Sequence, residues 1–141
     1  MSRAGRLLAV DYGERRIGLA VSDPLGTIAT PLDPLERRPG KRVPVARLVR
    51  LATELSVTGF VVGLPLDGDG NDLPRAADVR TLAAKLEERT GLPVQLVDER
   101  YTTAAALRRV REMGGSTFGR RGDIDSLSAA VLLQGVLNAA K

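Results

Sequence analysis

The stretch LLAVDYGERRIGLAVSD, residues 7–23, sets the expectations for the rest of the chain. The apolar run Leu7–Val10 leads into Asp11, and the charged turn Glu14–Arg16 separates it from a second apolar run, Ile17–Val21. Two short apolar runs this close together predict a β-hairpin. Asp11 is predicted to end the first strand at the sheet edge, held rigidly yet reaching solvent, as a metal ligand or catalytic acid requires. An Asp that only caps the turn is the alternative.

The remaining pattern predicts the order β-β-β-α-β-α-β-α-α. After the hairpin we expect a third strand at 27–35, helices at 43–55, 74–90, 102–113 and 123–141, strands at 58–64 and 94–97, and a loop rich in Gly and Arg at 114–122. Pro31 and Pro34 predict that the third strand lies at a sheet edge, because proline cannot donate to a central ladder. Three antiparallel strands followed by two helical crossovers predict an α/β protein with a mixed five-stranded sheet flanked by helices, the order of the ribonuclease H-like fold.

The composition of the chain limits the kinds of catalytic and metal site that it can form. The chain has 141 residues, of which 43% are hydrophobic and 27% charged, which predicts one soluble domain over residues 1–141. It has no apolar run of about 18 residues and no signal-peptide pattern, so we expect a cytoplasmic protein without a membrane partner. It contains no Cys and no His, which excludes disulfides, His-dependent nucleophile systems and an ordinary zinc site. Any metal must have oxygen ligands, as Mg²⁺ or Mn²⁺ does.

Positive charge is concentrated in two segments. The net charge is +4, yet residues 36–50 hold six basic side chains against one acidic, and residues 100–122 hold the same ratio. Most of these basic residues are Arg, whose planar guanidinium matches phosphate geometry. The pattern predicts contacts with a polyanion such as nucleic acid. Solvated surface charge is the alternative for each segment.

Three acidic residues are predicted to meet at one end of the sheet. Asp11 ends the first strand, Glu99 follows the strand at 94–97, and Asp125 lies in the first turn of the last helix. Strand ends and helix starts converge in parallel α/β arrangements. Three close carboxylates repel one another unless a cation lies between them, and two Mg²⁺ ions can activate water and stabilise the leaving oxygen of a phosphodiester. These residues therefore predict metal-dependent phosphodiester hydrolysis.

Two other motifs carry less weight. The loop Asp67–Asp72 superficially suggests a calcium loop, but Asp72 stands where an EF-hand needs Gly, so a solvated turn is expected. Gly63, at the end of a predicted strand, could let a nucleic-acid backbone approach closely.

Four ordered blocks resemble the YqgF family, also called RuvX: VDYGERRIGLAVSD, VVGLPLDGDG, VDERYTT and IDSLSAAVLLQ. The resemblance covers Arg6 to Asn138. It implies a ribonuclease H-like nuclease that processes the 5′ end of pre-16S rRNA or, alternatively, a Holliday-junction resolvase. The family's acidic positions fall on Asp11, Glu99 and Asp125. Junction resolvases of this fold often carry two acids on the last helix, three residues apart, and three residues after Asp125 this chain has Ser128. The fourth metal ligand, Asp123 or Asp98, stays open.

The sequence therefore predicts a nuclease that uses Mg²⁺ or Mn²⁺ and binds structured RNA or branched DNA, as a monomer or a homodimer. The basic residues expected to contact nucleic acid near the acids are Arg15, Arg16, Arg100, Arg120 and Arg121. The stretch Arg37–Arg50 is expected to contact the backbone independently of sequence. Since only 3% of residues are aromatic, base stacking is not the expected mode of recognition. The alternatives are an ATP-binding module, which normally needs two such domains, and a non-catalytic nucleic-acid adaptor.

Overall fold

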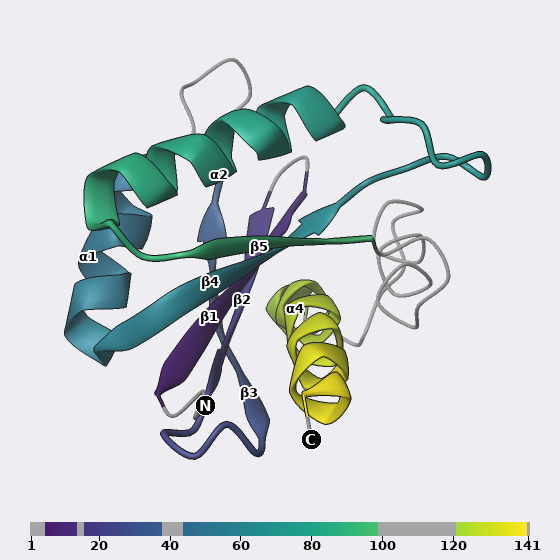
Figure 1. The fold of residues 1–141 in the computed structure, drawn as a ribbon. Coiled ribbons are helices and arrows are strands. Elements are labelled where there is room, and N and C mark those ends of the chain that lie inside the picture. The colour runs from purple at the N-terminus through teal and green to yellow at the C-terminus, as the bar shows by residue number, and fades with distance from the viewer. Residues whose placement is uncertain (1–4, 14–15, 38–43, 99–120, 141) are drawn as a thin grey trace.

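A computed structural model describes residues 5–13, 16–37, 44–98 and 121–140, with only the backbone described for 121–125. The elements are β1 (Arg6–Tyr12), β2 (Arg16–Ser22), β3 (Ala29–Glu36), α1 (Val45–Leu55), β4 (Val57–Leu64), α2 (Ala76–Thr90), β5 (Val94–Asp98) and α4 (Arg121–Ala139). Figure 1 shows their arrangement. The order agrees with the sequence prediction, apart from the helix expected at 102–113, which lies outside the described residues.

The five strands form one sheet in the order β3-β2-β1-β4-β5. β1 pairs with β2 and β2 with β3 in antiparallel fashion, whereas β4 runs parallel to both β1 and β5. The mixed sheet and the edge position of β3 were both predicted. Because β1, β3, β4 and β5 run in the same direction, their carboxyl ends lie at one end of the sheet, called here the carboxyl end.

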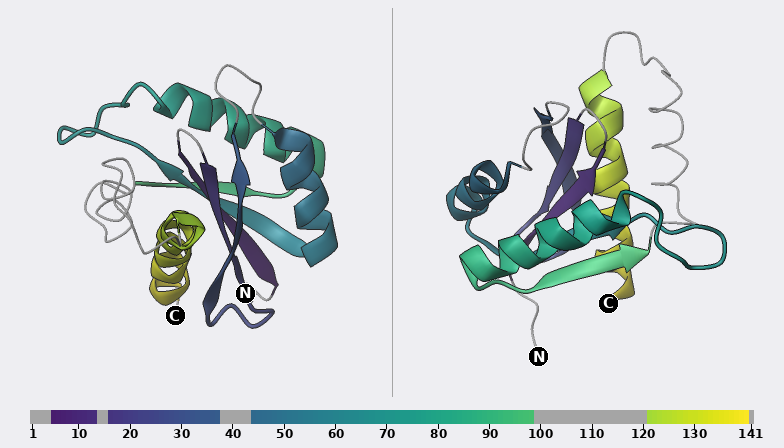
Figure 2. Two further views of the ribbon diagram at one scale, coloured as in Figure 1. Left: turned by 180° about the vertical axis from the view of Figure 1, so that it is seen from behind. Right: turned by 90° about the horizontal axis from the view of Figure 1, so that it is seen from above.

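Helices cover the sheet on both sides. Figure 2 shows α1 and α2 on one face and α4 on the other. The face under α1 and α2 buries alternate residues of β1, including Leu8 and Val10, with Phe60 of β4. The face under α4 buries Ala9 and Val61 against Leu133. β1 and β4 are therefore apolar on both faces, as expected of strands buried between two layers.

Element boundaries differ from the prediction by at most two residues. α2 ends at the predicted C-terminal glycine, Gly91, whose φ of 71° is left-handed and whose N–H bonds to the carbonyl of Glu87. The prediction of a loop through Gly122 is wrong at its end, because α4 begins at Arg121. A glycine costs a helix only about 1 kcal/mol, which the packing of a 19-residue helix can outweigh. No helix within the described ranges is long and apolar enough to span a membrane.

Candidate active site

Asp11 is the next-to-last residue of β1, a strand with a partner on each side. Its side chain is 1% exposed, so the expectation that it follows the strand and reaches solvent is wrong. The ladder continues to the pair Tyr12–Ile17, one residue further than the apolar pattern indicated. Leu7 and Ala9 pack in the α4 cluster, and strand alternation puts Asp11 on the same face. Burying an ionised carboxylate is costly unless it is paired or binds a cation.

A glycine lies beside Asp11 on each neighbouring strand. Gly18 of β2 is directly opposite Asp11. On the other side, Val10 of β1 pairs with Val62 of β4. One residue further along both strands, Gly63 therefore lies next to Asp11. Both glycines are buried, and neither is among the glycines with positive φ. Their backbones would accept other residues, so what distinguishes these positions is the missing side chain next to the carboxylate.

The register of β5 distinguishes between the two neighbouring acids at its end. Val97 packs against the α4 cluster, whereas Asp98 pairs with Leu64, which belongs to the cluster under α1 and α2. Asp98 therefore lies on the face opposite to that of Asp11. Glu99 lies outside the described residues.

The start of α4 lies near the level of Asp11 along the sheet. The Ser126 hydroxyl donates a hydrogen bond to the Leu32 carbonyl, and Leu32 is connected through Leu19 to Val10 in the strand ladder. Asp125 is the fifth residue of α4, one turn before Ala129, which is buried against the sheet. Its backbone is described and its side chain is not. Asp123 precedes it by two residues, about 200° around the helix.

Within the described residues no group of three acidic, His or Cys side chains could hold a metal ion. Two members of the predicted trio, Glu99 and the Asp125 side chain, fall outside those residues, so the trio stays a prediction. Ser128, three residues after Asp125, is fully buried.

The predicted basic contacts have different outcomes. Arg15, Arg100 and Arg120 lie outside the described residues, and only the backbone of Arg121 is described. Arg16 begins β2 and is partly buried. From the stretch 37–50, Arg47 and Arg50 are exposed on α1.

Arg37 was expected to contact the nucleic-acid backbone, but its described contacts are within the protein. It packs inward over the Tyr12 ring, with the guanidinium carbon 4.4 Å from the ring centroid. Burial raises the pKa of the Tyr12 hydroxyl, although the positive charge of Arg37 acts in the opposite direction. Sequence reasoning missed this contact and Gly18. The strict pairing of a hairpin could have found Gly18, since Tyr12–Ile17 pairing fixes Asp11 opposite Gly18.

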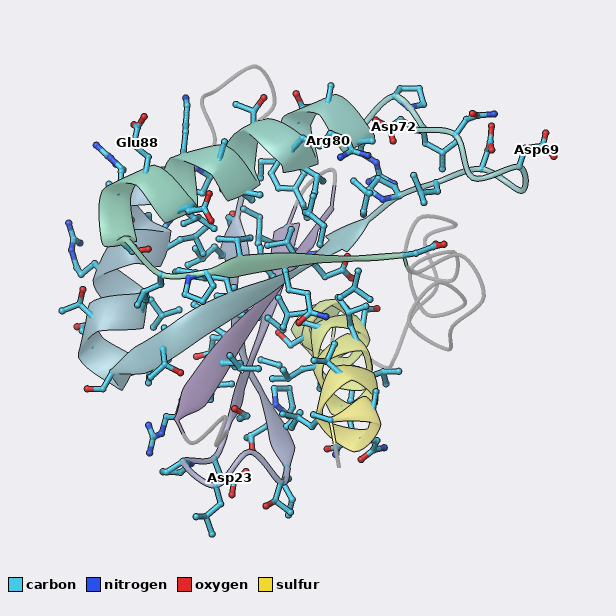
Figure 3. The ribbon with its side chains drawn as sticks, in the orientation of Figure 1. Asp23, Asp69, Asp72, Arg80 and Glu88 are labelled. Atoms are coloured by element: carbon cyan, nitrogen blue, oxygen red, sulfur yellow. The ribbon has the colours of Figure 1, made fainter. Side chains whose placement is uncertain are left out.

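The loop between β4 and α2 is the solvated turn that was expected. Asp67 accepts hydrogen bonds from the backbone N–H groups of Asp69 and Asn71. Asp72 forms a two-bond ion pair with Arg80, each bond 2.9 Å long, which holds the pKa of the Asp72 carboxyl below its usual value. Figure 3 shows this pair where the loop joins α2, with Asp69 at the exposed tip and Asp23 toward the opposite end of the molecule.

Comparisons with known proteins agree with the resemblance in the sequence. The sequence model of the family described as "RuvX: Holliday junction resolvase" matches residues 5–139. A protein of Clavibacter michiganensis named "Putative pre-16S rRNA nuclease" is 40% identical over 99% of this chain and 86% of its own length. One of the same name from Koribacter versatilis is 44% identical over 94% of this chain and 86% of its own.

Solved structures agree on the fold. Thermus thermophilus RuvC in complex with a Holliday junction substrate superposes with a TM-score of 0.59, covering 96% of this chain and 95% of that one, at 17% identity. At this identity the likeness shows the ribonuclease H-like fold alone. The family match over nearly the whole chain, together with relatives at 40% identity or more, shows that this chain belongs to the RuvX, or YqgF, family.

Proposed function

We propose that this chain, a nuclease of the RuvX family, uses Mg²⁺ or Mn²⁺ to cleave phosphodiester bonds in structured nucleic acid, and that it processes the 5′ end of pre-16S rRNA. The observation that carries the proposal is the position of Asp11, a buried carboxylate in the middle of the sheet, between two strands that each place a glycine beside it. The names of its relatives support the rRNA substrate.

The available ligands fit a hard divalent cation. The chain has no His and no Cys, so carboxylate oxygens are its charged ligands, and these are what Mg²⁺ and Mn²⁺ prefer. We propose that Asp11, Glu99 and Asp125 hold the ions. The register supports Glu99 over Asp98, and the position of α4 supports Asp125. When bound, such ions polarise phosphoryl oxygens and lower the pKa of water.

The chain's own residues then have separate tasks. The buried Asp11 carboxylate gives the site negative charge at a fixed place in the sheet. The glycines beside it leave room for a substrate phosphate, and the exposed Arg47 and Arg50 on α1 contact the nucleic-acid backbone through charge. With no His in the chain, proton transfer falls to carboxylates, Lys, Tyr or water.

Cleavage of a four-way DNA junction is the second candidate. The description of the matching family as a Holliday junction resolvase favours it. A resolvase cuts two strands and is expected to act as a dimer, whereas an rRNA-trimming enzyme need not. We propose that the enzyme lies in the cytoplasm, where pre-rRNA is found.

The test compares cleavage of a pre-16S rRNA fragment and a four-way DNA junction in Mn²⁺, with and without chelator, using wild type, Asp11→Asn and Glu88→Gln. We expect Asp11→Asn to abolish cleavage yet bind nucleic acid at least as tightly, because a charge that repels phosphate is removed. Glu88 is exposed near the C-terminal end of α2 (Figure 3), and α2 covers the face of the sheet opposite to that of Asp11, so Glu88→Gln should cleave like wild type. Wild-type cleavage by Asp11→Asn, or cleavage that survives chelation, would refute the proposal.

A further inference from the structure

We propose that Arg37 is a positioning residue that fixes the backbone following Asp11 from the opposite face of the sheet. The inference rests on the proposed role of Asp11 as a metal ligand. Sequence reasoning grouped Arg37 with the phosphate-binding arginines, whereas its contacts are internal.

Among the described residues, three contacts of the Arg37 side chain connect two parts of the fold: two are to consecutive residues at the end of β1, and one is to α2. Its guanidinium lies over the Tyr12 ring at 4.4 Å, its Nη1 donates a hydrogen bond of 3.1 Å to the Gly13 carbonyl, and its Nη2 lies 3.9 Å from Oδ2 of Asp78 on α2. The side chain is only 19% exposed. Arg37 therefore connects the end of β3 with the end of β1 and the first turn of α2.

Two of these contacts are to the residues directly after Asp11. Tyr12 is 1% exposed and belongs to the cluster under α1 and α2, so it anchors β1 from the side opposite to Asp11. Gly13 also donates its N–H to the Arg16 carbonyl at 3.1 Å, which closes the hairpin. Arg37 thus limits the movement of the two residues that determine where the Asp11 carboxylate lies.

The Tyr12 hydroxyl allows the contribution of the ring to be isolated. Among the described residues it is buried without a hydrogen-bond partner. A Phe at this position would keep the surface on which the guanidinium rests and remove only that hydroxyl. A Leu would remove the ring, and with it a cation–π contact that is stronger when desolvated.

The experiment measures kcat, KM and thermal stability for Arg37→Met, Arg37→Lys, Tyr12→Phe and Tyr12→Leu, alongside wild type and Asp11→Asn. It also measures Mn²⁺ affinity without substrate, from the electron paramagnetic resonance signal of the free ion. Arg37→Met should lower kcat about 10- to 100-fold, the usual effect of a small misplacement of a catalytic group. Its KM should stay within about twofold, since uniform substrate binding is unchanged, and Mn²⁺ binding should weaken.

The other variants test whether the effect comes from the contact between Arg37 and the Tyr12 ring. Arg37→Lys should recover part of the loss, because it keeps the charge but not the planar fork. Tyr12→Phe should match wild type, and Tyr12→Leu should follow Arg37→Met. Arg89→Met, on the exposed end of α2, controls for loss of an arginine. Val57→Ala, at the opposite end of the sheet, controls for loss of stability alone.

The outcomes separate this inference from the proposed function. If Asp11→Asn is inactive but Arg37→Met behaves as wild type, the positioning role is refuted and the proposed function stands. A raised KM with unchanged kcat would make Arg37 a substrate contact and also refute it, as would unchanged Mn²⁺ affinity with a kcat loss no greater than that of Val57→Ala. If Asp11→Asn is active, the proposed function fails first. Should Arg37→Met not fold, Arg37→Lys and Tyr12→Leu give the same readouts.

Discussion

Gly18 lies directly opposite Asp11, and we expect its lack of a side chain to leave space beside the carboxylate. A Cβ there would stand on the face of Asp11 within cross-strand contact distance. We expect Gly18→Ala to lower kcat at least about tenfold, because small displacements in an active site have large effects on rate. Single-turnover cleavage at saturating Mn²⁺ measures this.

Gly59 provides the matched control, since it also lies inside a strand. A Cβ at Gly59 would come within 3.1 Å of a Leu7 methyl and 3.3 Å of the Pro93 carbonyl, away from Asp11. Gly59→Ala should lower the melting temperature and leave kcat unchanged. Wild-type cleavage by Gly18→Ala would show that the space beside Asp11 is not used.

The sequence singled out Asp11 but did not predict its surroundings. Asp11 stood out because a lone carboxylate follows an apolar run, yet that run does not reveal that the ladder extends to Tyr12 and buries the acid. The internal contacts of Arg37 were not predicted for a related reason. Local charge density does not show which arginine packs inward, and the ring that holds Arg37 comes from a strand 25 positions earlier.

At the scale of elements, the ion pair between Asp72 and Arg80 fastens the β4–α2 loop to α2. Arg80 lowers the pKa of the Asp72 carboxyl, first through their hydrogen bonds and then through its charge. A carboxyl whose pKa is lower in the folded state stabilises the fold above its unfolded pKa of about 4, and this contribution is lost as the pH falls through the folded value.

We therefore expect Asp72→Asn to lower the melting temperature slightly at pH 7 and to approach wild type at acidic pH, as the Asp72 carboxylate of the wild type becomes protonated. The effect is small because both side chains are about half exposed. Thermal unfolding at the two pH values measures it, with Asp69→Asn at the loop tip as the control. A difference between Asp72→Asn and wild type that persists at low pH would show that the pair does not act through charge.

Elements were predictable from the sequence where the pattern was local. The prolines of β3 predicted its edge position, and Gly91 predicted the end of α2. The start of α4 was not predictable to the residue, since helix propensity argues against Gly122 and the packing of later turns such as Ala129 and Leu133 determines the outcome. The face on which Asp98 lies also could not be predicted without the register of β5 on β4.

At the scale of the whole molecule, the sheet separates two tasks. The face under α4 carries the Asp11 carboxylate, and the face under α1 and α2 carries the Tyr12 ring and the arginine that rests on it. Residues adjacent in sequence thus act on opposite sides because a strand alternates. An arginine can contribute its charge to substrate binding only where its side chain remains exposed.

Arg47 and Arg50 of α1 are such residues, and their contribution can be measured from the salt dependence of binding. Each phosphate contact adds about 0.7 to 0.9 to the slope of log affinity against log salt concentration. We expect the double variant Arg47→Ala/Arg50→Ala to lose up to two such increments of the slope. Its affinity for RNA and its affinity for DNA should fall by the same factor, and its kcat should not change. Fluorescence anisotropy over a salt series measures the slope.

Glu54, exposed on the same helix, provides the control of opposite sign. Glu54→Gln removes a negative charge, so it should strengthen binding at low salt and have little effect at high salt, where screening shortens the range of charge. If the arginine pair left the slope unchanged while Glu54→Gln also had no effect, nucleic acid would not pass near α1. The electrostatic contact would then have to come from basic residues elsewhere in the chain.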